Sequence, residues 1–142
     1  MKYLALLLLT GCNAAPALFE TPCGLRFIQA GEWTPEIAAE YEARALEALK
    51  GIADPRFANA CEAMRGVEVN VRPSIYLDDK ASMGLAYCPQ GRIEIGNQPP
   101  WASSLAHEMT HIVQGCESEG TDQHVNWWEL RIYDVLVSIY PT

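Results

Sequence analysis

His107-Glu108-Met109-Thr110-His111 is the stretch that most constrains the fold and the chemistry of this chain. Because an α-helix turns once every 3.6 residues, two histidines four positions apart project from the same face. Two such imidazoles can bind one zinc ion, and the intervening glutamate can reach a water on the metal. The motif therefore predicts a zinc site on a helix, with His107 and His111 as ligands and Glu108 as the catalytic base. The alternative is a surface helix with two solvated histidines.

The residues around the motif extend the predicted helix over about 100–114, and Gly115 is expected to end it. On an ideal helix the histidines lie roughly 180–240° from Leu105, on the side opposite the apolar side chains. We therefore expect one face of the helix to pack on the core and the histidine face to line a cleft. The apolar face consists of Trp101, Leu105, Met109, Ile112 and Cys116.

A catalytic zinc ion takes three protein ligands and keeps one position open. The main candidates for the third ligand are His124 and Glu129, which lie about 140° apart if a helix begins before His124, so only one of them can bind the ion. His124 is favoured because imidazole suits zinc and a polar loop precedes it. Three further acids lie in that loop, and one of them, Asp122, can instead orient a ligand imidazole. They are Glu117, Glu119 and Asp122.

A final helix is predicted over roughly 123–139, because apolar residues recur there at helical spacing. This predicted apolar arc consists of Val125, Trp128, Ile132, Leu136 and Ile139.

Upstream of the motif, the sequence predicts a support helix and a small sheet. Thr34-Pro35-Glu36 is typical of a helix start, and Lys50-Gly51 of a helix end. Alternation over 67–71 predicts a half-buried strand, which 74–77 either extends or follows as a separate short strand. Residues 83–87 and 92–95, joined by a turn at 89–91, predict a further pair. The expected fold class is therefore α+β.

The N-terminus indicates export. Lys2 is followed by a nearly all-leucine run over 4–9, which is too short to span a bilayer but typical of a secretory signal. Leu9-Thr10-Gly11-Cys12 resembles the bacterial lipoprotein signal, which implies lipid on Cys12 and removal of residues 1–11. The alternatives are a plain signal peptide or an uncleaved anchor.

On this prediction the protein is exported and anchored to a membrane of the bacterial cell envelope by its lipid. Residues 12–22 form the lipidated tether, and 23–142 form a single domain. The net charge of −8, without a basic patch, argues against nucleic acid as a partner. The sequence makes no prediction about the oligomeric state.

Apart from Cys12, the chain has four cysteines, and an even number in an exported protein suggests two disulfides. We favour Cys23–Cys61 and Cys88–Cys116, because Cys116 lies just past the predicted helix and Cys88 ends a strand expected nearby. No CxxC pair is present, which argues against a four-cysteine zinc site.

An antiparallel strand pair, the segment 105–111 and a later ligand-bearing helix together resemble the zincin metallopeptidases. The order of elements is similar to minimal zincin domains of the SprT-like type, whose third ligand is a histidine followed closely by a bulky aromatic. His124-Val125-Asn126-Trp127-Trp128 fits that description. The gluzincins, whose third ligand is a glutamate, are the other template and would use Glu129.

The resemblance covers roughly residues 66–140, and it implies one Zn²⁺ per chain and a peptide or protein substrate. It also implies that the substrate binds as an added strand, along 92–95 or 83–87. The expected activity is hydrolysis of peptide bonds by a zinc-activated water, with Glu108 as general base and then acid.

Two alternatives to this activity remain. One is a zinc-stabilised binding module without catalysis, for which Glu108 would be dispensable. The other is a tethered interaction protein without metal, whose histidines titrate near neutral pH.

Overall fold

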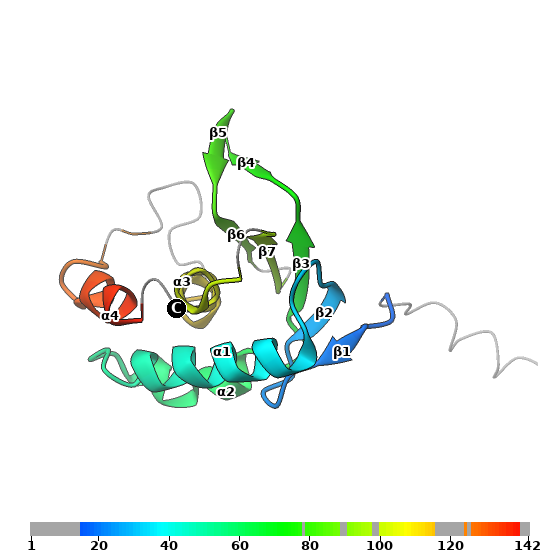
Figure 1. Ribbon diagram of the computed structural model, residues 1–142. Helices are drawn as coiled ribbons and strands as arrows, with labels where there is room; N and C mark the ends of the chain where they lie inside the picture. The colour runs from blue at the N-terminus through cyan, green and yellow to red at the C-terminus, as the bar shows by residue number, and fades with distance from the viewer. Residues whose placement is uncertain are drawn as a thin grey trace, which may run out of the picture.

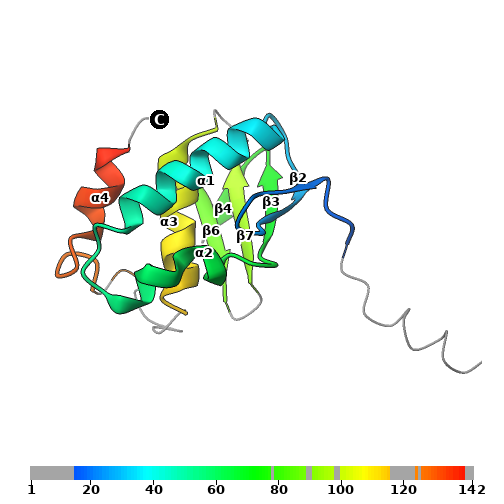
Figure 2. The ribbon, with the colours of Figure 1, turned by 90° about the horizontal axis from the view of Figure 1, so that it is seen from below.

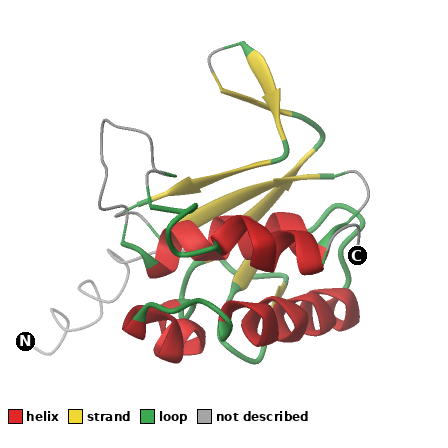
Figure 3. Ribbon diagram, turned by 90° about the vertical axis from the view of Figure 1, so that its left-hand side faces the viewer, coloured by secondary structure: helices red, strands yellow, loops and turns green. Residues whose placement is uncertain are grey.

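The computed structural model describes residues 15–77, 79–88, 91–97, 100–115, 124 and 126–139. These residues form an α+β fold, as expected from the sequence, with a five-stranded mixed sheet and helices packed against one of its faces (Figures 1 and 3). No helix in the described part of the chain is long and apolar enough to cross a membrane.

The five-stranded sheet has the order β1-β2-β3-β7-β6, so β6 lies at one edge and β7 in the interior. Strand β3 pairs in parallel with both β2 and β7, whereas β1–β2 and β6–β7 are antiparallel. The sequence predicted β3, β6 and β7 but not the first two strands. The strands are β1 (Phe19–Glu20), β2 (Arg26–Gln29), β3 (Glu68–Arg72), β6 (Gly84–Tyr87) and β7 (Arg92–Gly96). Strand β1 lies within the segment that we expected to be a tether.

The core lies between the sheet and the helices. Alternate residues of β3 and β7, Val69, Val71, Ile93 and Ile95, are buried, as period-two alternation requires. Each buried side chain of this kind stabilises the fold by roughly 1.5–3 kcal/mol. Seen from below, α1 crosses this face of the sheet (Figure 2).

The support helix is confirmed as α1 (Pro35–Leu49), and the Thr34 hydroxyl accepts a hydrogen bond from the Ile37 amide at 3.2 Å, as an N-cap should. A short 3-10 turn, η1 (Pro55–Asn59), and α2 (Ala60–Ala63) follow it. The motif helix is α3 (Ala102–Val113), and Gly115 beyond its end has a φ of +66°, a conformation that favours glycine.

The last helix is shorter than predicted. Helix α4 spans Ile132–Ser138, and 126–131 form turns in which Arg131 adopts a φ of +57°. Because the helical repeat does not extend through these turns, the apolar arc is wrong at Trp128, whose side chain is 75% exposed, while Trp127 is fully buried. Ile132 and Leu136 are buried as expected.

Residues 74–77 do not extend β3. Strand β4 (Ile75–Leu77) instead pairs with β5 (Lys80–Ser82) in a separate antiparallel hairpin. This β4–β5 hairpin projects away from the helices (Figures 1 and 3).

The disulfide between Cys23 and Cys61 is confirmed, and it joins the segment after β1 to helix α2. The second predicted pair includes Cys116, which lies outside the described residues, so that pair stays a prediction. Cys12 lies outside them too.

A buried carboxylate, Glu42 on α1, reinforces the same region. It accepts hydrogen bonds from the Thr21 hydroxyl and, at 3.0 Å, from the Cys23 amide. Burial raises the pKa of Glu42, and these two hydrogen bonds offset the rise only in part. The carboxyl therefore holds its proton more tightly in the folded protein than in the unfolded chain.

We expect Glu42 to make stability decline with rising pH. Its folded pKa is raised above 4.5, so its contribution is complete below that pH and is lost as the pH rises through the folded value. Urea unfolding of the wild type and Glu42→Gln from pH 4 to 8 should give diverging curves, with the wild type losing more of its free energy of unfolding. Glu36→Gln, at an exposed position of the same helix, is the control for loss of one charge. Parallel wild-type and Glu42→Gln curves would contradict the prediction.

Candidate metal centre

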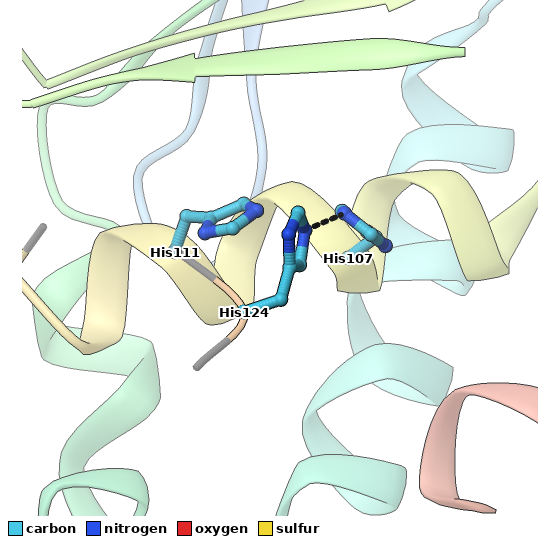
Figure 4. A group of neighbouring side chains, drawn as sticks. All are labelled: His107, His111 and His124. Atoms are coloured by element: carbon cyan, nitrogen blue, oxygen red, sulfur yellow. Dashed lines mark hydrogen bonds between the residues drawn. The ribbon is translucent and has the colours of Figure 1, made fainter. Parts of the chain in front are cut away.

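Three histidines from two segments come together at the centre of α3 (Figure 4). His107 and His111 lie one turn apart on the helix, and His124 reaches them from the turn-forming segment before α4. One ring nitrogen of each residue lies within 4.8 Å of the others. His107 Nε2 and His124 Nε2 are 3.3 Å apart, the contact drawn as a dashed line.

The histidine side of α3 lines a cavity only in part: His107 borders one, together with Glu108, whereas His111 does not. His111 is buried, as are Glu108 and Thr110, while Leu105 and Met109 pack on the core as expected. Helix α3 is thus covered around most of its circumference. The periodicity of α3 alone could not predict this, since the covering side chain comes from elsewhere in the chain.

Trp127 is that covering side chain. Its ring centroid lies 4.7, 4.8 and 4.5 Å from the ring centroids of His107, His111 and His124. Its indole Nε1 donates a 2.8 Å hydrogen bond to Gln114 Oε1, just past the end of α3. Sequence reasoning noted an aromatic residue after His124 but assigned Trp127 no contact with the imidazoles.

The site holds His107 in its neutral form. Burial, and secondarily the charge of His124, lowers the pKa of His107 to about 4. At neutral pH its imidazole therefore carries a free lone pair, which is the form that binds a metal ion.

This donor set fits a tetrahedral metal ion. Two imidazole nitrogens at about 2.0–2.1 Å from one zinc ion lie roughly 3.3 Å apart. His107 Nε2 and His124 Nε2 already have a separation of 3.3 Å, and the His111 ring lies nearby. Three imidazoles suit zinc as well as copper, iron or nickel. His107, His111 and His124 together can therefore hold a metal ion.

Glu129, the other main candidate for the third ligand, does not join this cluster. Glu129 is exposed in the turns before α4 and is not a member of the histidine group. The loop acids Glu117, Glu119 and Asp122 lie outside the described residues.

Glu108 is buried on α3 beside the edge strand. Burial raises the pKa of its carboxyl to about 8. A Cβ atom at Gly84 of β6 would lie only 2.5 Å from Glu108 Oε1, so glycine is the residue that leaves room for this carboxylate. Sequence reasoning missed Gly84, whose one signal was a glycine within a predicted strand.

A cavity of about 460 Å³ opens beside His107 and Glu108, and both residues line it. Its other walls come from Ser103 and Ser104 at the start of α3, from residues 82–84, and from helix α4. The α4 wall is largely apolar and consists of Tyr133, Leu136 and Val137. This size is within the range of small-molecule and peptide sites.

Comparison with protein-family models, with curated proteins and with solved structures gives no match to this chain.

We expect one zinc ion per chain, held by three histidines. The wild type, His107→Ala, His124→Ala and Glu129→Gln would be remetallated with Zn²⁺, dialysed and measured by elemental analysis. Each histidine variant should lose the ion, since two remaining imidazoles bind it far more weakly, and Glu129→Gln should keep it. Loss of zinc from Glu129→Gln, with retention by His124→Ala, would make the glutamate the third ligand.

Proposed function

We propose that this protein is a zinc-dependent peptidase that cleaves peptide bonds at the three-histidine centre. One observation carries the proposal: a buried carboxylate, Glu108, lies next to a three-imidazole cluster and lines the same cavity as His107. A purely structural metal site would not need an acid between two ligands, nor an open cavity beside it.

His107, His111 and His124 would hold the zinc ion. A zinc ion bound there would supply a Lewis acid that polarises the peptide carbonyl and makes a water molecule more acidic. Trp127 would keep the three rings in place by packing on them, and Gln114 would fix the indole through its hydrogen bond.

Glu108 would accept a proton from water at its carboxylate and then donate it to the leaving amine. Burial raises its pKa to about 8, and a dication held by the histidines would lower that pKa again. A group that exchanges its proton near neutral pH is suited to serve as both base and acid.

Of the two strands expected to pair with the substrate, β6 and β7, the order of the sheet favours β6. Strand β7 lies between β3 and β6 and so has no unpaired edge, whereas β6 lies at the edge of the described sheet. A substrate segment would add to β6, where Gly84 contacts Glu108. Its side chains beside the cleaved bond would face the apolar α4 wall of the cavity.

The proposal includes a lipid anchor at Cys12. Phe19, the first residue of β1, lies seven positions after Cys12. An extended chain of that length reaches about 25 Å at most. The domain would therefore act close to the membrane surface.

Replacement of Glu108 by glutamine should abolish catalysis without loss of zinc. Glutamine has nearly the same shape but cannot exchange the proton, so kcat should fall by about 10²–10⁴-fold. Cleavage of a quenched fluorescent peptide library and elemental analysis would be measured on the same samples. Glu129→Gln, which changes an exposed acid, is the matched control. Unchanged activity in Glu108→Gln would favour a zinc-stabilised binding module over an enzyme.

Gly84→Ala should impair catalysis by displacing the same carboxylate. The added Cβ would require Glu108 to shift from its place against β6, and we expect a loss of kcat of about tenfold or more. Zinc content should not change, because the three atoms nearest to the added Cβ all belong to Glu108 and not to a histidine. Leu85→Ala, the next residue along β6, controls for general disturbance of the strand. Equal activity of Gly84→Ala and Leu85→Ala would contradict the prediction.

A further inference from the structure

A second cavity, of about 310 Å³, lies beneath the β4–β5 hairpin. Three separate segments form its walls: the hairpin itself, the end of β7 and the residues that lead into α3. The large side chains among them are Ile75, Tyr76, Ile95 and Trp101. We name this space the hairpin cavity.

The hairpin cavity adjoins the cavity at Glu108. Ser82, Met83 and Ser104 line both spaces, so the two are separated by little more than these residues. Met83 is half exposed and is the largest of these three shared side chains. A ligand that fills one cavity can therefore extend past Met83 into the other.

The chemistry of the walls limits what can bind. None of the described residues that line the hairpin cavity is charged; its polar members are serines and Asn97. An ionised side chain would lose its hydration there without gaining a partner of opposite charge. An aliphatic or aromatic side chain would instead bury apolar surface against Ile75 and Tyr76.

The hairpin leaves apolar surface uncovered. Its strands are only three residues long, and a two-stranded hairpin of that size is marginally stable by itself. The Tyr76 side chain is 65% exposed although it lines the cavity. A chain bound beneath the hairpin would cover this ring.

We propose that the hairpin cavity binds a second uncharged apolar side chain of the same peptide whose cleaved bond lies at Glu108. This inference rests on the proposed peptidase function. Side chains two residues apart in an extended chain lie on one face at a spacing of roughly 6.6 Å. Two adjoining cavities that share Ser82, Met83 and Ser104 as walls suit such a pair. The substrate is thus an extended segment with apolar residues at two alternate positions.

Binding of peptide hydroxamates to the zinc-loaded protein tests this without turnover. Every probe carries leucine beside the hydroxamate, and the residue two positions further along is phenylalanine or alanine. One series extends from each side of the hydroxamate, so both chain directions are covered. Isothermal titration should show, in one series, about tenfold tighter binding with phenylalanine.

Two variants of the hairpin test whether the hairpin cavity causes this preference for phenylalanine. Tyr76→Ala should reduce the preference for phenylalanine to less than threefold. Lys80→Ala, on the same hairpin but not in the cavity wall, should retain it. Equal binding of phenylalanine and alanine probes in both series, with zinc-dependent binding intact, would overturn the hairpin site alone. Absence of any zinc-dependent hydroxamate binding would overturn the proposed function and this inference together.

Discussion

The structure depends on the burial of polar side chains around α3, and Trp127 is the residue that completes it. Its ring contacts all three imidazoles, while the sheet covers Glu108 from the other side. Removal from water disfavours charge on His107 and on Glu108, so the pKa of His107 falls to about 4 and that of Glu108 rises to about 8. One physical cause thus produces a neutral imidazole at His107, which is the form that binds a metal ion, and a protonated acid at Glu108, from which a nearby dication would favour loss of the proton.

The sheet determines where this chemistry can act. Strand β7 lies between β3 and β6, so the antiparallel strand β6 is at an edge of the described sheet, next to α3. Gly84 on that edge allows the strand and Glu108 to approach each other closely. Backbone hydrogen bonds would therefore align a substrate that pairs with β6 beside the buried carboxylate. The two adjoining cavities would each bind one of its side chains.

Patterns among neighbouring residues predicted the helices α1 and α3. The spacing of His107 and His111 and the cap at Thr34 both depend on a few neighbouring residues, and α3 and α1 formed as expected. Strands β1 and β2 were missed because they are short and β2 pairs in parallel with a distant segment, so little local pattern marks them. Trp127 rather than Trp128 lies in the core because residues 126–131 form turns in place of the predicted helix, a change that periodicity does not reveal.

Because of the position of His124, the proposed metal ion would also link α3 to the segment that leads into α4. His124 is supplied by turns rather than by a helix, and these turns lead directly into α4. Tyr133 and Leu136 of α4 form one wall of the cavity at Glu108. An ion shared by His124 and the two α3 histidines would therefore hold α3 and the α4 wall in one arrangement. Since ligand binding energy adds to folding energy when the site forms only in the folded state, the metal would stabilise the cavity as well as the reaction centre.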